Sequence, residues 1–150
     1  MQAWRNRHTH KVKSEFDPNV YYTSTKTTVS MIHYHFVFCP RYRRKIFLIK
    51  GVEDMFKQLT INECQWRNIQ ILAMECHKDH VHLFVKCLPT QSPQDVMKWI
   101  KDPSSKILRD TFPQLSKMPS LWTRSYFVST AWNVSSAIIK NYIDTQKTRP

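Results

Sequence analysis

The segment from residue 68 to residue 88 constrains the fold of this chain most strongly, because it has the pattern of a single β-hairpin. Residues 68–76 (NIQILAMEC) and 80–88 (HVHLFVKCL) are both short apolar runs rich in strand-forming side chains. Only the three polar residues at 77–79 (HKD) separate them, which is the length of a hairpin loop. We therefore expect two antiparallel strands joined by a short polar turn.

One strand and one helix precede this hairpin, and another strand follows it. A strand is expected at 29–40 (VSMIHYHFVFCP), where both faces are largely apolar, as in the centre of a sheet, and Pro40 ends it. In 50–66, apolar residues recur at i, i+3, i+4 and i+7, which predicts an amphipathic helix. Residues 121–131 (LWTRSYFVSTA) predict the fourth strand, after a loop at 113–120.

A second helical region lies between the hairpin and the fourth strand. Ser92 and Pro93 form a helix start, and this helix is expected to end near Lys101. Asp102-Pro103 interrupts the pattern, because proline removes a helix hydrogen bond and crowds the preceding turn. A separate short helix is therefore predicted over 104–110.

The last predicted element is a helix at 134–147 (VSSAIIKNYIDTQK), capped by Asn133 or Ser135. The element order is then β-α-β-β-α-β-α. Its first six elements match a ferredoxin-like (RRM-like) α+β fold, in which two helices cover one face of a four-stranded antiparallel sheet. The other face stays open, and nucleic-acid-binding modules often use such a face. We expect residues 29–150 to form a single domain and the polar, basic residues 1–28 to form a flexible N-terminal extension.

Charge and composition narrow the function classes. The 150 residues include 23 Lys and Arg against 11 Asp and Glu, and this net charge of +12 favours a polyanionic partner such as nucleic acid. A charge that serves only solubility is the alternative. Gly51 is the single glycine, which excludes the glycine-rich P-loop and dinucleotide motifs. The cysteines form no C-x-x-C pair, and neither a signal peptide nor a membrane span is visible. We therefore expect a cytoplasmic protein with reduced thiols and no membrane partner.

Histidines two residues apart occur three times. The pairs are His8/His10, His33/His35 and His80/His82. Residues i and i+2 of a strand point to the same side, so His80 and His82 can converge on one cation. An ordinary hydrogen-bonded pair is the alternative, because the spacing alone is a weak signal. Glu75 and Asp79 are candidates to orient these imidazoles as hydrogen-bond acceptors, or are ordinary turn residues. The pair at 33 and 35 has no assigned role, and the pair at 8 and 10 is interpreted as incidental.

Tyr142 and Gln146 are a second candidate constellation. They lie at i and i+4 of the last predicted helix and therefore share one face. A tyrosine is able to act as a nucleophile when a nearby dication helps to polarise its phenol, and a glutamine oxygen is a suitable ligand for that metal. The alternative interpretation of Tyr142 is a core aromatic residue at helical spacing.

The basic segment RYRRK follows the first predicted strand. Arginine binds phosphate as a fork and stacks on bases, and tyrosine stacks as well, so this segment is a candidate DNA contact. A solvated loop is the alternative. The candidate residues are Arg41, Tyr42, Arg43, Arg44 and Lys45. Base stacking or core packing is expected for Trp122, Tyr126 and Trp132.

These motifs together resemble a known family. A strand is followed by YRRK, a helix, a hairpin with DHVHLF, the pattern W..SYFVST..NVS and a helix ending in YIDTQ. The order is similar to that of the single-tyrosine transposases of the HUH endonuclease superfamily, the TnpA-like enzymes of small insertion sequences. The resemblance extends from about residue 30 to residue 147.

The resemblance implies a specific chemistry. His80, His82 and Gln146 would bind a divalent cation, Mg²⁺ or Mn²⁺, and Tyr142 would attack a DNA phosphodiester to form a 5′-phosphotyrosine and release a 3′-OH. Attack by another 3′-OH would rejoin the strands without ATP. The family acts on single-stranded DNA, recognises hairpins at element ends and works as homodimers, in which the tyrosine helix is able to serve the partner subunit. Such a protein would be cytoplasmic and associated with the nucleoid when bound to DNA.

Two departures and two alternatives accompany this resemblance. The family often has glycine before the tyrosine helix, where this chain has Trp132, and residues 1–28 are not part of the pattern. A stiffer or displaced hinge is the expected consequence of the first departure. The alternatives to a transposase are a domesticated nickase of repeat hairpins and a non-catalytic ferredoxin-like nucleic-acid-binding protein.

Overall fold

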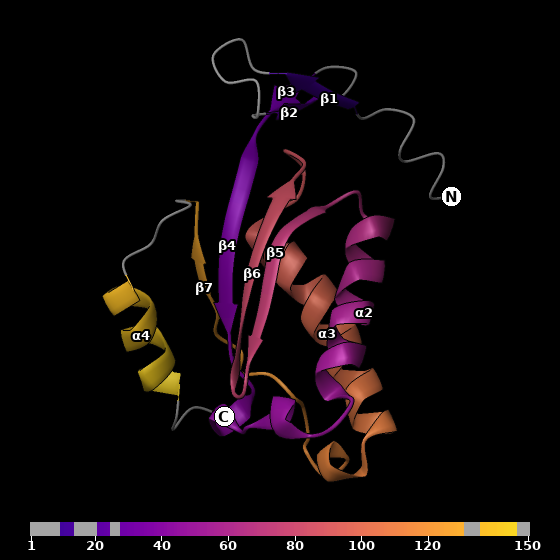
Figure 1. Ribbon diagram of the computed structural model, residues 1–150, viewed down its shortest axis with the longest axis vertical. Coiled ribbons are helices and arrows are strands. Elements are labelled where there is room, and N and C mark those ends of the chain that lie inside the picture. The colour runs from indigo at the N-terminus through magenta and orange to yellow at the C-terminus, as the bar shows by residue number, and fades with distance from the viewer. Residues whose placement is uncertain (1–9, 14–20, 25–27, 131–135, 147–150) are drawn as a thin grey trace.

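A computed structural model describes residues 10–13, 21–24, 28–130 and 136–146 (Figure 1). Its main sheet has the strand order β5-β6-β4-β7, and every neighbouring pair is antiparallel. The strands are β4 (Ile32–Phe38), β5 (Gln70–His77), β6 (His80–Cys87) and β7 (Phe127–Ser129). The first of these four strands thus lies between the third and the fourth. This order confirms the ferredoxin-like α+β prediction.

Two long helices cover one face of this sheet, α2 (Val52–Trp66) and α3 (Pro93–Thr111) (Figure 1). On β4, Phe36 and Phe38 face these helices in the hydrophobic core. The alternate residues His33, His35 and Val37 therefore point to the opposite face. The two histidines of β4 therefore lie on the face of the sheet that is turned away from α2 and α3.

The hairpin turn is shorter than the sequence analysis predicted. Only Lys78 and Asp79 form the turn, and His77 belongs to β5, where it is paired with His80. A two-residue connection is a common hairpin turn, and cross-strand partners in an antiparallel pair share a face. His77 therefore lies on the face that carries His80 and His82, and not in the loop where it was predicted.

Helix α3 continues through Pro103, so the predicted break at this residue is wrong. Ile100, Ser104 and Leu108 form one continuous buried stripe, whereas Pro103 itself is exposed. The hydroxyl of Ser104 donates a hydrogen bond to the Ile100 carbonyl at 2.6 Å. Packing of this stripe thus outweighs the cost of an internal proline, which is about 3 kcal/mol.

The fourth strand is only three residues long, whereas the prediction covered 121–131. The preceding segment instead makes an isolated bridge between Pro40 and Trp122. The buried Lys101 ammonium on α3 donates hydrogen bonds to the carbonyls of Thr123 and Ser125, each at 2.9 Å. A side chain from another element thus satisfies backbone acceptors that strand pairing would otherwise use.

A second, separate sheet precedes the main one. It consists of β1 (His10–Lys13), β2 (Tyr21–Ser24) and β3 (Val29–Ser30). The sequence analysis assigned no strands before residue 29 and joined Val29–Ser30 to the next strand. The structure divides that strand at Met31, because β3 pairs with β2 whereas β4 pairs with β6 and β7. Flexibility of the whole extension stays a prediction.

Three short 3₁₀ helices and one α-helix complete the described chain. The 3₁₀ helices are η1 (Arg41–Arg43), η2 (Ile46–Leu48) and η3 (Pro113–Leu115). Helix α4 (Ser136–Thr145) lies beside β7, on the side of the sheet away from α2 and α3 (Figure 1). Its predicted caps, Asn133 and Ser135, lie outside the described residues. None of the helices in the described parts of the chain is long and apolar enough to cross a membrane.

Candidate active site

Three histidines of the β5–β6 hairpin form a cluster on the sheet face that α2 and α3 leave uncovered. One ring nitrogen from each of His77, His80 and His82 lies within 4.8 Å of the others. His80 and His82 are partly buried, and His77 is exposed. The strand geometry thus brings the predicted pair together and adds a third imidazole. His77 is not among the ligands predicted from the sequence, because a three-residue turn was expected there, whereas the two-residue turn places it on this face.

Asp79 holds the ring of His80. The Nδ1 atom of His80 lies 2.8 Å from one carboxylate oxygen of Asp79, which is only 3% exposed. When Nδ1 donates to this carboxylate, Nε2 keeps its lone pair and is able to bind a cation. Burial alone would raise the pKa of Asp79, but hydrogen bonds from His80 and Arg43 outweigh it and lower this pKa. Asp79 therefore stays ionised.

His35 contacts His82 from the neighbouring strand. Nε2 of His35 and Nδ1 of His82 lie 3.2 Å apart and share a hydrogen bond. The His35 ring is 4% exposed and stacks on Phe84, with the ring centroids 3.9 Å apart. Burial lowers the pKa of His35, and burial together with the charge of neighbouring histidines lowers the pKa of His82 to about 4. Both rings are therefore neutral near pH 7, as a metal ligand must be.

Glu75 lies on the same hairpin, but its carboxylate approaches His77 and not the ring that Asp79 binds. Its carboxylate oxygen lies 3.7 Å from Nε2 of His77, and its side chain is 68% exposed. Of the two predicted orienting residues, Asp79 therefore contacts a histidine of the predicted pair, and Glu75 approaches the additional one.

Tyr142 on α4 and Gln146, the residue directly after this helix, lie together and surround Ser125. The Tyr142 hydroxyl is 3.4 Å from Ser125 Oγ, and the Tyr142 ring packs against Phe127 with centroids 5.9 Å apart. Phe127 pairs with Val37, which also pairs with His82, so the Tyr142 ring packs on the histidine face.

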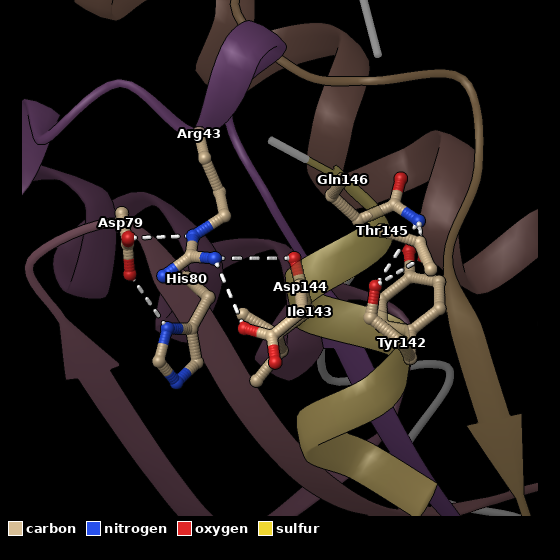
Figure 2. Close-up of polar contacts among 8 residues, drawn as sticks. All are labelled: Arg43, Asp79, His80, Tyr142, Ile143, Asp144, Thr145 and Gln146. Carbon is tan, nitrogen blue, oxygen red and sulfur yellow. Dashed lines mark hydrogen bonds and ion pairs between the residues drawn. The ribbon is translucent and has the colours of Figure 1, made fainter. Parts of the chain in front are cut away.

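The amide of Gln146 is engaged within this group. Its oxygen accepts a hydrogen bond from Ser125 Oγ at 2.6 Å, and its nitrogen donates to the Tyr142 carbonyl and to Thr145 Oγ1. Figure 2 shows His80 and Gln146 separated by the Asp144 and Ile143 part of the helix. The structure thus brings Tyr142 and Gln146 together without directing Gln146 at the histidines, and a metal role for Gln146 stays a prediction.

Arg43 connects the hairpin turn to α4 (Figure 2). Its Nε donates to Asp79 at 2.8 Å, and its Nη1 lies 3.4 Å from an Asp144 carboxylate oxygen and 3.5 Å from the Ile143 carbonyl. The backbone of Tyr42 and Arg43 is left-handed, with φ values of 56° and 51°, and this uncommon conformation accompanies the approach to Asp79. Arg43 was predicted to contact DNA, but here its guanidinium binds two carboxylates of the protein.

The other residues of RYRRK stay candidates for DNA contact. Tyr42 is 52% exposed, and the Arg44 guanidinium lies 5.9 Å from the centre of its ring. Lys45 is exposed as well. Arg41 is partly buried and lines a cavity of about 330 Å³ together with Lys98, Lys101 and Arg124.

Burial distinguishes core packing from base stacking for some of the three aromatic residues considered above. Trp122 is 4% exposed, and its indole N–H donates to Ser104 Oγ at 2.9 Å, so it is a core residue. Tyr126 is partly buried against Phe36, with ring centroids 6.1 Å apart. Trp132, and with it the predicted stiff hinge, lies outside the described residues.

The family model and the related proteins that match this chain are all transposases. The model of the IS200-like transposases matches residues 28–146. The transposase for insertion sequence element IS200 of Salmonella typhimurium is 34% identical over 119 residues, which cover 75% of each chain. The ISDra2 transposase TnpA of Deinococcus radiodurans is 30% identical over 121 residues, which cover 79% of this chain and 86% of that one.

Solved structures have the same fold. A crystal structure of a Deinococcus radiodurans protein assigned as a transposase superposes with a TM-score of 0.74 and 27% identity, over 82% of this chain and 96% of that one. A REP-associated tyrosine transposase bound to a REP hairpin gives a TM-score of 0.52 at 14% identity, over 75% of this chain and 62% of that one. The second likeness concerns the fold alone. The match over residues 28–146 confirms the resemblance seen in the sequence, and the chain belongs to the IS200-like transposase family.

Proposed function

We propose that this transposase cleaves and rejoins single-stranded DNA at the ends of an insertion sequence, with Tyr142 as the nucleophile. The observation that carries the proposal is the hydrogen bond from His80 to the buried Asp79, beside a neutral His82. This arrangement prepares two imidazoles for a cation on the face against which the Tyr142 ring packs. If Asp79, His80 and His82 had only a structural role, a buried carboxylate that orients His80 and leaves its Nε2 atom available would not be needed.

The residues fit a divalent cation, Mg²⁺ or Mn²⁺. His80 and His82 would hold it. Gln146 would become a further ligand if its hydrogen bonds to Ser125 and Thr145 were broken and its oxygen turned to the cation. When bound, such a cation would polarise the scissile phosphate and lower the barrier to attack on phosphorus. His35 and Asp79 would keep the two imidazoles in their orientation and tautomer.

Tyr142 would then carry the covalent step. Its phenol loses a proton, the Oη atom attacks phosphorus, and the bond from phosphorus to the 3′ oxygen breaks. The products are a 5′-phosphotyrosine and a free 3′-OH, which takes up a proton. Attack of a 3′-OH on the phosphotyrosine reverses these changes and rejoins the strands, so no nucleotide cofactor is required. The single glycine of the chain agrees with the absence of a P-loop.

We further propose that the substrate is a DNA hairpin and that the protein acts as a homodimer. The net charge of +12 favours a phosphate backbone. The structural neighbour that is bound to a REP hairpin makes hairpin DNA the first substrate to test. The separation of Gln146 from the histidines is compatible with an active site that α4 of a second subunit completes.

The test is the formation of a protein–DNA adduct that survives denaturation. The purified protein is incubated with single-stranded hairpin DNA and Mn²⁺ and then run on a denaturing gel. We expect an adduct with the natural protein and with Tyr34→Phe, and none with Tyr142→Phe or after addition of EDTA. An adduct with Tyr142→Phe would exclude Tyr142 as the nucleophile, and cleavage in EDTA would exclude a metal role for the histidines. DNA binding without any adduct would favour the non-catalytic alternative.

A further inference from the structure

His77 is the one histidine of the hairpin cluster that neither the predicted site nor the proposed reaction uses. We infer that His77 is a third cation ligand, so that the β5–β6 hairpin binds a divalent cation through three imidazoles before Gln146 reaches it. The inference rests on the proposed cation site at His80 and His82. It changes which residues complete that site and which metals it prefers.

The register of the hairpin places His77 correctly for this role. His77 is paired with His80 across the two-residue turn, and Glu75 is paired with His82. The rings of His77 and His80 are nearly parallel, with centroids 4.4 Å apart, and the candidate nitrogens of all three histidines lie within 4.8 Å. Nitrogens that share a metal at about 2.1 Å lie no more than about 4.2 Å apart and point at one centre, so the His77 ring must rotate out of its stack on His80 to bind the same cation.

The surroundings of His77 allow that rotation. Its side chain is 48% exposed, whereas His80 and His82 are fixed by Asp79 and His35. The carboxylate of Glu75 lies 3.7 Å from Nε2 of His77. An imidazole that gives one nitrogen to a carboxylate presents the other to a metal, as His80 does with Asp79. The present 3.7 Å is longer than a hydrogen bond, and a rotation of His77 that shortens it would give Glu75 the role for His77 that Asp79 has for His80.

Gln146 is less available than His77 in the protein without DNA. It is 1% exposed, and both atoms of its amide form hydrogen bonds, to Ser125, Thr145 and the Tyr142 carbonyl. Ligation by its oxygen would require the loss of the 2.6 Å bond from Ser125. The DNA-free protein would thus bind its cation with the hairpin alone.

Three imidazoles also change the preferred metal. Nitrogen-rich sites favour the later divalent transition metals, whereas Mg²⁺ prefers oxygen ligands and keeps its water. The hairpin would consequently bind Co²⁺ in preference to Mg²⁺, and removal of His77 would reduce this preference.

The experiment measures Co²⁺ binding to the DNA-free protein by calorimetry and by visible absorption. We expect His77→Ala to weaken Co²⁺ binding by about tenfold or more, at least the loss caused by removing a hydrogen bond that supports a ligand. The Co²⁺ spectrum should change, and the ratio of Co²⁺ to Mg²⁺ affinity should fall. Gln146→Ala and the control His33→Ala, which removes a histidine elsewhere on the same face, should bind Co²⁺ within about twofold of the natural protein. Circular dichroism checks that each variant is folded.

The outcomes separate this inference from the proposed function. If His80→Ala abolishes Co²⁺ binding while His77→Ala keeps the affinity and spectrum of the natural protein, His77 is not a ligand and the two-histidine site remains. If Gln146→Ala weakens binding as strongly as His80→Ala, the amide completes the site before DNA arrives and the inference is wrong. If neither His80→Ala nor His82→Ala affects binding, the cation site itself is wrong and the inference falls with it.

Discussion

Among single residues, His35 shows why a histidine interrupts the otherwise apolar strand β4. Its ring is buried, stacks on Phe84 and shares a hydrogen bond with His82. Valine or isoleucine would pack at this position with less loss of hydration but would leave Nδ1 of His82 without this partner. The sequence alone assigns no role to His33 and His35, because a strand pattern does not indicate which strand will be its neighbour.

We predict that His35→Phe weakens Mn²⁺ binding by about tenfold, because the hydrogen bond that orients His82 is lost while the aromatic stack on Phe84 is kept. Titration of free Mn²⁺ by electron paramagnetic resonance measures the affinity. His33→Phe is the matched control. Equal affinities for the two variants would show that His35 only fills space.

A second prediction at this scale concerns pH and stability. Burial lowers the pKa of His82 from 6.5 to about 4, so below pH 6.5 the unfolded chain takes up a proton that the folded protein does not. The free energy of unfolding should therefore fall between pH 6.5 and pH 4. Urea denaturation in EDTA should show this fall, and His82→Leu should reduce it. An unchanged pH dependence in His82→Leu would show that His82 is not buried as a neutral ring.

Among the helices and strands, those whose formation depends mainly on neighbouring residues were predicted from the sequence. The apolar run of β4 and the apolar spacing of α2 were sufficient to predict these two elements. The continuity of α3 through Pro103 and the short β7 were not predictable, because packing of α3 and the hydrogen bonds of Lys101 come from distant parts of the chain. The same holds for the contacts of Arg43.

Arg43 joins three elements, and its removal is expected to be costly. We predict that Arg43→Ala lowers the free energy of unfolding by about 1–3 kcal/mol, because Asp79 is buried and loses a charged hydrogen-bond donor. Arg44→Ala, which alters an exposed neighbour, should stay within about 0.5 kcal/mol. Urea denaturation gives both values. A small effect of Arg43→Ala on stability with a large effect on DNA affinity would favour the DNA contact predicted from the sequence.

At the scale of the whole molecule, the two faces of the sheet have different tasks. Helices α2 and α3 bury one face (Figure 1). The histidine cluster lies on the other face, against which the Tyr142 ring of α4 packs. The sequence predicted some members of the candidate site but not His35 or His77. It did not predict their arrangement, because i and i+4 spacing on a helix does not determine where that helix docks. The position of Gln146 on Ser125 is the clearest case.

A mixing experiment tests whether two subunits share an active site. We predict that Tyr142→Phe and His80→Ala, each inactive alone, recover about a quarter of natural adduct formation when they are mixed and refolded together. Half of the dimers are then mixed, and each of these has one complete site if α4 serves the partner subunit. No recovery in dimers shown to have exchanged subunits would place Tyr142 and the histidines of one site in the same subunit.

The proposed reaction depends above all on Tyr142, which would form the covalent bond to DNA. The most direct measurement is mass spectrometry of the tryptic peptides after reaction with hairpin DNA and Mn²⁺ and removal of the DNA by nuclease. Cleavage after Lys140 and Lys147 yields the peptide 141–147, whose one tyrosine is Tyr142. The account predicts that this peptide carries a nucleotide through a tyrosine phosphodiester. A nucleotide attached to any other residue, or DNA cleavage that leaves every peptide unmodified, would contradict it.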